Sequence, residues 1–319
     1  MKKGIKCLIS GGAGFIGSHL CDRLSTSENE IYCIDNLITG NINNIKHLLR
    51  KPNFHFIRHD LVKEFSLSVL KKINRVTQIY HLASPASPPK YQKYPIETLL
   101  VNSFGTYNLL ELARANNAVF LLASTSEVYG NPLIHPQNEK YFGNVNPVGI
   151  RSCYDESKRF AESITMEYFR KFRTDVRIIR IFNTYGPRML PDDGRVISNF
   201  INQAIKGKDL VIHGDGLQTR SFCYVSDMVQ GIFSVMLSAQ ARGEVINLGY
   251  PEEQTIYQIA QIVLQLTKSR SKIKYSRKLE DDPEKRRPDI SKAKQILRWQ
   301  PTISLEDGLI KTIEFFSSK

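Results

Sequence analysis

A short stretch near the start of the chain joins an apolar strand, a glycine-rich turn and a helix. Residues 5–10 are apolar enough for a buried strand, and the sequence GGAGFIG follows at once at residues 11–17. Glycine lets the backbone turn tightly and approach another group closely. An amphipathic segment at residues 18–24 comes next, so backbone N–H groups at a helix N-terminus can meet a pyrophosphate. The stretch therefore predicts an open α/β sheet whose first turn binds a dinucleotide.

An acidic residue at the end of the next predicted strand indicates the kind of dinucleotide. This strand covers residues 31–34 and is followed by Asp35. A carboxylate in this position accepts hydrogen bonds from ribose hydroxyls and repels a 2′-phosphate. The sequence therefore predicts NAD, rather than NADP, as the cofactor.

Another apolar run, at residues 119–123, passes directly into hydroxyl groups and one carboxylate at residues 124–127. The carboxyl end of a buried parallel strand is the usual position of a site in an open α/β sheet. Further along, Tyr154 and Lys158 are spaced to share one face of a predicted helix. A lysine ammonium favours the phenolate and is expected to lower the pKa of Tyr154 toward the range of a general base. Thr125 is expected to supply a second hydroxyl to the same substrate oxygen.

The predicted elements alternate between strands and helices, which is typical of α/β proteins with a doubly wound parallel sheet (Rossmann-like). Further strands are predicted at residues 54–57, 78–82, 176–181 and 244–249. From residue 183 onward, short helices and strands indicate a smaller mixed α/β domain. We therefore expect an NAD-binding domain at residues 1–182, with a return segment near 226–250, and a substrate domain at residues 183–319.

Three local predictions concern helices. The prolines between Pro85 and Pro95 favour a loop over the site. Residues 96–116 are predicted to form one amphipathic helix. Ser226 is predicted to cap a helix that runs to about Leu237.

The composition excludes several classes of protein. The chain is 41% hydrophobic and 24% charged, as in ordinary globular domains, and its apolar runs are shorter than the ~18–20 residues of a membrane span. The five cysteines show no metal-ligand spacing, which favours free thiols and no metal site. The formal charge of +13 fits a lysine-rich surface or attraction of an anionic substrate, and no nucleic-acid-binding motif accompanies it. Because the chain begins directly at its first strand, a cytoplasmic protein is expected.

Several longer segments are similar to one family of enzymes. They are HLASPASPPKY at residues 81–91, LLASTSEVYGNP at 121–132, SCYDESKR at 152–159, RIFNTYGPRM at 180–189 and DDPEKRRPDI at 281–290. Together with the glycine-rich turn, they resemble the extended short-chain dehydrogenase/reductase family over essentially the whole chain. Within this family they look like the UDP-glucuronate decarboxylases, also called UDP-xylose synthases.

The resemblance implies a complete reaction cycle on one nucleotide sugar. The 4-hydroxyl of UDP-glucuronate is oxidised with NAD, the resulting β-keto acid loses CO2, and the bound NADH reduces the ketone to give UDP-xylose. Ser126 is too weak an acid to expel a hydroxyl as in the related dehydratases, and Glu127 argues against the free rotation that a 4-epimerase needs. A UDP-glucuronate 4-epimerase, a decarboxylase that releases the keto pentose, and a NAD-binding scaffold without catalysis are the alternatives.

The resemblance also assigns residues to roles. Catalytic roles are implied for Thr125, Glu127, Tyr154, Lys158 and Arg286, where Arg286 meets the sugar carboxylate and Glu127 serves as proton donor, water-orienting base or positioner. The implied cofactor-binding residues are Gly11, Gly14, Phe15, Ile16, Gly17, Asp35, Asn36, Thr39, Gly40, Asp60, Leu61, Leu82, Ser84, Asn102, Tyr154, Lys158, Thr184 and Arg188. The implied substrate-binding residues are Asn183, Arg195, Val196, Asn199, Val211, Arg220, Tyr224 and Arg286. Leu100 stands where many relatives carry a lysine, so a contact made by that lysine is not expected here.

The resemblance finally implies how the chain assembles. The predicted helices at residues 96–116 and 154–172 form the face through which this family dimerises. The expected partners are therefore UDP-glucuronate and a second copy of the chain, and neither nucleic acid nor a membrane.

Overall fold

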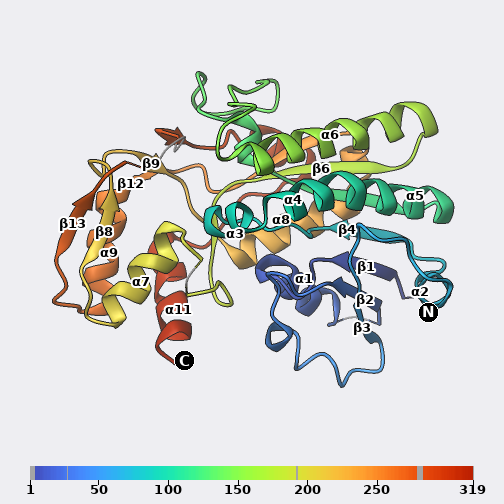
Figure 1. The fold of residues 1–319 in the computed structure, drawn as a ribbon, viewed down its shortest axis with the longest axis horizontal. Coiled ribbons are helices and arrows are strands. Elements are labelled where there is room, and N and C mark those ends of the chain that lie inside the picture. The colour runs from blue at the N-terminus through green and yellow to red at the C-terminus, as the bar shows by residue number, and fades with distance from the viewer. Residues whose placement is uncertain (1–3, 27, 192, 279–282, 319) are drawn as a thin grey trace.

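The computed structural model describes residues 4–26, 28–191, 193–278 and 283–318, and its centre is a seven-stranded parallel sheet. The strands are β1 (Lys6–Ser10), β2 (Glu30–Asp35), β3 (Phe54–Arg58), β4 (Gln78–His81), β5 (Val119–Thr125), β6 (Val176–Ile181) and β11 (Val245–Leu248). Their order is β11-β6-β5-β4-β1-β2-β3, and every neighbouring pair is parallel. The order of the strands along the sheet therefore proceeds outward from β1 on both sides (Figure 1). This order confirms the predicted doubly wound, Rossmann-like sheet.

Helices cover both faces of this sheet, which explains why its strands are largely apolar. Along β1, Leu8 and Ile9 are fully buried in two different clusters of the core, because neighbouring side chains of a strand point to opposite faces. One face carries α1 (Phe15–Leu24) and α8 (Val225–Leu237), and the other carries α5 (Thr106–Asn116) and α6 (Ser152–Phe172). Figure 1 shows α5 and α6 running side by side over the sheet.

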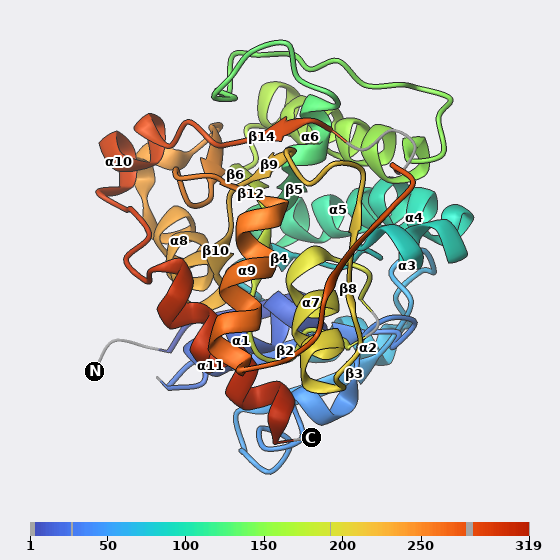
Figure 2. The ribbon, with the colours of Figure 1, turned by 90° about the vertical axis from the view of Figure 1, so that its left-hand side faces the viewer.

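A smaller region of short elements lies beside the main sheet. Its helices α7 (Val196–Ile205), α9 (Ile256–Thr267) and α11 (Leu305–Ser317) pack on one another, as Figure 2 shows. Small sheets of two or three strands complete it: β8 (Leu210–His213) with β13 (Ile273–Ser276), β7 (Thr184–Tyr185) with β10 (Cys223–Tyr224), and β9 (Thr219–Arg220) between β12 (Gln254–Thr255) and β14 (Lys285–Arg286).

The segment near residues 226–250 returns to the main sheet. There α8 packs on β6, β11 pairs with β6, and α10 (Ser291–Leu297) packs against β11. The exact domain bounds, with a division at residue 182, remain a proposal. Asp281 and Asp282, which open the DDPEKRRPDI segment, lie outside the described residues, as does Asp192.

Three predicted helix boundaries are wrong. The proline-rich segment contains two short helices, α3 (Pro88–Lys93) and α4 (Pro95–Leu100), because proline in a first turn lacks only an N–H that has no helical partner there. The predicted helix at residues 96–116 is interrupted by a π-turn (Val101–Gly105) before α5 begins. Helix α8 starts at Val225 with Tyr224 as its N-cap, so Ser226 lies inside the first turn.

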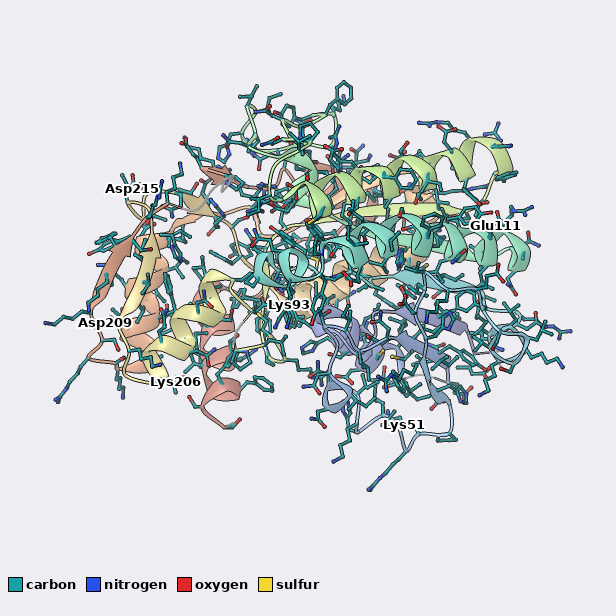
Figure 3. The ribbon with its side chains drawn as sticks, viewed as in Figure 1. Lys51, Lys93, Glu111, Lys206, Asp209 and Asp215 are labelled. Atoms are coloured by element: carbon teal, nitrogen blue, oxygen red, sulfur yellow. The ribbon has the colours of Figure 1, made fainter. Side chains whose placement is uncertain are left out.

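The remaining helical elements are short. They are α2 (Leu67–Ile73) and 3-10 turns at Ile42–Asn44, Ser126–Tyr129 and Ala239–Ala241. Within the described ranges, none of the helices combines the length and the apolar composition needed to cross a bilayer, and no cluster of His, Cys, Asp or Glu is arranged for a metal ion. Figure 3 shows lysines such as Lys51, Lys93 and Lys206 at separate places on the molecule, as expected of a lysine-rich surface.

Candidate active site

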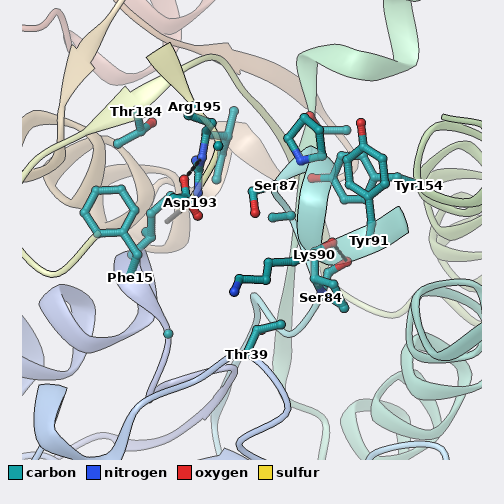
Figure 4. Close-up of a pocket in the computed structure, with 18 of the residues that line it drawn as sticks. Phe15, Thr39, Ser84, Ser87, Lys90, Tyr91, Tyr154, Thr184, Asp193 and Arg195 are labelled. Atoms are coloured by element: carbon teal, nitrogen blue, oxygen red, sulfur yellow. Dashed lines mark hydrogen bonds and ion pairs between the residues drawn. The ribbon is translucent and has the colours of Figure 1, made fainter. Parts of the chain in front are cut away.

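A cleft of about 870 Å³ lies between the carboxyl ends of the central strands and the smaller region. Residues of the glycine-rich turn, the end of β5, α3, α6, α7 and β14 line it, and Figure 4 shows part of this lining. All of the predicted catalytic, cofactor-binding and substrate-binding residues line the cleft except Asn102 and Tyr224. The fold therefore gathers into one cavity a set of residues that spans most of the chain.

Asn102 and Tyr224 do not line the cleft, and their roles as ligand contacts stay predictions. The amide nitrogen of Asn102 donates to the hydroxyls of Ser84 and Ser157, both at 3.0 Å, and its Oδ1 has no hydrogen-bond partner among the described residues. The ring of Tyr224 packs edge-on against Tyr185 with centroids 5.6 Å apart. Both side chains therefore contact other elements next to the residues that line the cleft.

The glycine-rich turn packs closely against its surroundings. Gly11 has a φ of +71°, and a Cβ there would lie 2.7 Å from the backbone of Ala83. A Cβ at Gly17 would lie 2.1 Å from the carbonyl oxygen of Gly11. A larger residue at either position would displace backbone. The turn thereby brings to the cleft the first N–H groups of α1, which have no partner within the helix.

Asp35 ends β2 at the same end of the cleft. Its carboxylate accepts hydrogen bonds from the backbone N–H groups of Ala13 at 3.0 Å and Leu37 at 2.8 Å. Burial raises the pKa of Asp35, and these two hydrogen bonds oppose that rise. Asp35 therefore ties the glycine-rich turn to the end of β2 while it lines the cleft.

This donor set fits NAD. The N–H groups at the start of α1 suit a pyrophosphate, and Asp35 is placed to accept from ribose hydroxyls. Residues 36–44, several of which line the cleft next to Asp35, contain no lysine or arginine that could pair with a 2′-phosphate. The fit to NADP is accordingly poorer.

Farther along the cleft, α6 presents Tyr154 and Lys158 close together, with Lys158 Nζ 5.9 Å from the centroid of the Tyr154 ring. Lys158 Nζ donates to the carbonyl oxygen of Ala123 at 2.9 Å, and burial lowers the pKa of Lys158 to about 7. Burial also raises the pKa of Tyr154, which a hydrogen bond with Thr125 only partly offsets. The expectation of a lowered Tyr154 pKa is therefore wrong for this arrangement. Burial of the phenol away from water raises its pKa more than the neighbouring dipole and charge lower it.

Tyr91 is a site residue that the sequence reasoning misses. It lies on α3, and its ring stacks on that of Tyr154 with centroids 5.1 Å apart and an interplanar angle of 3° (Figure 4). Its hydroxyl is buried and has no hydrogen-bond partner among the described residues. A prediction of a helix starting at the Pro-Pro pair, instead of a loop, would have pointed to it.

Glu127 lies just after β5 within a cluster of arginines. It forms ion pairs with Arg151 and, at 3.5 Å, with Arg286 Nη2. Burial raises the pKa of Glu127, but the positive charges of Arg286, Arg151 and Arg220 outweigh burial and hold this pKa at about 2. Glu127 is therefore ionised at neutral pH, which argues against a proton held on Glu127 itself. Arg151 is a second residue that the sequence reasoning misses, although it precedes the SCYDESKR segment directly.

Arg286 is charged and yet only 1% exposed. Its Nη1 donates to the carbonyl oxygen of Ser126, and its Nη2 donates to that of Gly130 at 2.8 Å. The pairing of β14 with β9 sets Arg286 beside Arg220. The guanidinium of Arg286 is therefore not wholly free to bind a carboxylate through two hydrogen bonds, because Arg286 also holds the turn after β5. A carboxylate in the cleft would meet its remaining N–H groups.

Other cleft arginines are also held by acidic partners. Arg195 pairs with Asp193, and Figure 4 shows the two side chains directed at each other within the cleft. Arg188 Nη2 lies 2.7 Å from a carboxylate oxygen of Asp22 on α1, which places it near the predicted cofactor side. These pairs fix the positions of the positive charges along the cleft.

Comparison with known proteins shows the family to which this chain belongs. The family described as GDP-mannose 4,6 dehydratase matches residues 8–312. UDP-glucuronic acid decarboxylase 1 of Danio rerio is 51% identical over 312 residues, which cover 98% of this chain and 72% of that protein. UDP-glucuronic acid decarboxylase 2 of Arabidopsis thaliana is 49% identical over 321 residues, which cover 100% of this chain and 69% of that protein.

Solved structures share the fold at lower identity. The UDP-glucuronic acid 4-epimerase of Bacillus cereus, in complex with UDP-glucuronic acid and NAD, is 30% identical with a TM-score of 0.89, over 98% of this chain and 99% of that one. The fold is thus common to epimerases and decarboxylases, whereas the sequence is much closer to the decarboxylases. The chain belongs to the extended short-chain dehydrogenase/reductase family, in the group of the UDP-glucuronic acid decarboxylases.

Proposed function

We propose that this protein decarboxylates UDP-glucuronate to UDP-xylose with NAD as a bound cofactor. The observation that carries the proposal is the charge at the sugar end of the cleft, where one ionised carboxylate, Glu127, faces the three guanidinium groups of Arg151, Arg220 and Arg286. The excess positive charge suits a sugar that brings a carboxylate of its own. Decarboxylases about half identical to this chain over nearly its full length support the same substrate.

The residues around Tyr154 supply the proton transfers of this reaction. When bound along the glycine-rich turn and Asp35, NAD supplies a hydride acceptor for C4 of the sugar and later returns the hydride. Tyr154 accepts the proton of the 4-hydroxyl as its own proton moves on toward Lys158, whose pKa of about 7 lets it take up and release protons at neutral pH. Thr125, hydrogen-bonded to Tyr154, orients the same oxygen. During loss of CO2 these hydroxyls stabilise the negative charge that moves onto the oxygen at C4.

The arginine cluster orients the sugar carboxylate without binding it too firmly. Firm binding of the carboxylate would stabilise the ground state and slow the loss of CO2. Glu127 already pairs with Arg151 and Arg286, so it competes with the substrate for these guanidinium groups. We therefore assign Glu127 the role of positioner and Arg286 that of carboxylate contact through its remaining N–H groups. The other predicted cofactor-binding and substrate-binding residues keep their roles.

The proposal extends to assembly and location. The face formed by α4, the π-turn at Val101–Gly105, α5 and α6 exposes large apolar side chains, with Ile96 61%, Phe104 57%, Tyr107 45% and Phe160 50% exposed. Such a face suits a homodimer in which two copies cover it from water. Sedimentation of the purified protein should then show a dimer, and Phe160→Glu should favour monomers. A cytoplasmic location suits the free cysteines at all five positions.

Incubation with UDP-glucuronate tests the proposed activity. The purified protein with NAD should yield a UDP-pentose and CO2, and NADH should not accumulate in proportion to CO2 because the cofactor is regenerated in each cycle. UDP-glucose, which lacks the carboxylate, is the matched control and should release no CO2. A product of unchanged mass would identify a 4-epimerase instead, and NADH equal to CO2 would identify a decarboxylase that releases the keto pentose.

A further inference from the structure

A second cavity of about 370 Å³ lies directly behind the sugar end of the cleft. Glu127, Arg151 and Pro283 line both cavities and so form the wall between them. The rest of the second cavity is largely polar, with asparagines at positions 131, 144 and 146 and with Lys278. Most of these residues are exposed on their other side, so the cavity lies between the solvent and the wall at Glu127.

Asp155 lines the second cavity and not the cleft. It follows Tyr154 on α6, is 6% exposed, and its Oδ1 has no hydrogen-bond partner among the described residues. An acidic residue in the first turn of a helix is common, but such residues are normally exposed to water. Burial and the nearby Glu127 carboxylate raise the pKa of Asp155 to about 8, against the opposing effect of Arg151 and Arg286. Asp155 is therefore a buried acid that keeps its proton at neutral pH.

Several other charged or titratable groups lie near Asp155, but none of them replaces it as a proton donor. Among the described residues, further charged or titratable groups near Asp155 are Cys153, Tyr154 and Glu156 on its own helix, Tyr91 on α3, and Lys278 across the second cavity. The thiol and the two phenols have pKa values raised by burial, so they hold their protons too firmly to donate them readily.

The proposed reaction needs a proton that the cleft does not otherwise supply. When the carboxylate leaves as CO2, the electron pair of the broken bond from C5 must end in a new C5–H bond, so each turnover consumes one proton. The proton on Tyr154 is not free for this step, since it returns to the oxygen at C4 when the ketone is reduced. Glu127 has a pKa of about 2 and does not store a proton at neutral pH.

We propose that Asp155 holds the proton for C5 and that the second cavity is the route by which Asp155 recovers it from solvent. This inference rests on the proposed decarboxylation. The O–H bond of Asp155 breaks, the proton crosses the wall beside Glu127 along hydrogen-bonded water, and the C5–H bond forms with the electron pair left by the departing CO2. The Asp155 carboxylate then takes a new proton from water through the polar cavity. Asp155 acts through this water and so is a positioning residue that does not touch the sugar, while Glu127 stays ionised.

The variant Asp155→Asn tests this role because it keeps the shape of the side chain and removes the acid. NADH formation in the first turnover should be nearly unchanged, whereas formation of UDP-xylose should fall at least ~10-fold, so that NADH accumulates on the enzyme. The wild-type rate should decline as the pH rises through about 8, where Asp155 loses its proton, and this decline should be absent in the variant. Glu156→Gln, the neighbouring acid on the same helix, is the matched control and should behave like wild type.

A second variant keeps the test decisive if Asp155→Asn folds poorly. Asp155→Glu retains an acid and should retain a decline of rate at high pH, shifted in position, with little accumulation of NADH. Equal losses of NADH formation and UDP-xylose formation in Asp155→Asn would mean a structural role and overturn the proposal. An unchanged pH profile in Asp155→Asn would overturn it as well. Failure of the wild type to form any UDP-pentose would instead reject the proposed function.

Discussion

The two ends of the cleft are built in different ways. The nucleotide end is made of backbone: a turn in which Gly11 and Gly17 leave no room for a side chain, and a helix start that presents N–H groups. The sugar end is made of charged and hydroxylated side chains around Thr125, Glu127 and Tyr154. Binding a common cofactor therefore depends on the shape of the main chain, and the choice of reaction depends on a few side-chain atoms.

The two ends also differ in how their charges are stabilised. At the nucleotide end, the carboxylate of Asp35 accepts hydrogen bonds from two backbone N–H groups. At the sugar end, Arg286 is buried and the side chain of Glu127 is 18% exposed, and the two depend on each other because a buried charge without a partner is costly. A change at the sugar end is accordingly expected to affect several residues at once, whereas a change at the nucleotide end stays local.

The largest effect is expected from removing one oxygen at the sugar end. Tyr154→Phe keeps the ring that stacks on Tyr91 and deletes only the hydroxyl. The turnover number with UDP-glucuronate should fall by ~10²–10⁴-fold, because proton transfer at C4 loses its acceptor. Steady-state kinetics measures this loss, and Tyr107→Phe, at a residue 45% exposed on α5, serves as the control that should change little. A fall of less than ~10-fold would mean that another group accepts the proton at C4.

A smaller effect is expected from adding one carbon at the nucleotide end. In Gly17→Ala the new methyl group would lie 2.1 Å from the carbonyl oxygen of Gly11, so the turn must move. We expect the free energy of unfolding, measured without nucleotide, to fall by ~1–3 kcal/mol. In Gly14→Ala the nearest atom lies at 3.1 Å, so that variant should lose clearly less stability. Equal losses in the two variants would contradict a nucleotide end defined by backbone shape.

The smallest effect is expected from removing the charge of Asp35 at the nucleotide end. Asp35→Asn keeps an oxygen that can accept from Leu37 and removes the charge that repels a 2′-phosphate. The preference for NAD over NADP, measured as a ratio of dissociation constants by calorimetry, should narrow by about 10-fold, or ~1.4 kcal/mol. Wild-type protein that binds both nucleotides equally would show that Asp35 does not make the distinction.

The sequence predicts the nucleotide end far better than the sugar end. Residues 11–17 and Asp35 belong to one strand–turn–helix–strand unit, and local backbone rules are sufficient to recognise it. Glu127, Arg151 and Arg286 come from three separate parts of the chain, and no periodicity shows that they meet. Tyr91 is missed for a different reason, because the prolines before it favour a loop in a local sequence pattern although they occupy the first turn of α3.

The sequence by itself therefore determined the sheet, the glycine-rich turn and the pairing of Tyr154 with Lys158, and it predicts a preference for NAD. These features follow from local patterns of apolar residues and glycines, which act over a few neighbouring residues. Only the tertiary structure decided how these groups are perturbed: the arginines lower the pKa of Glu127, burial and Glu127 raise the pKa of Asp155, and the carbonyl oxygens of Ser126 and Gly130 engage Arg286. Burial and neighbouring charge set these states, and both arise when distant segments pack together and exclude water.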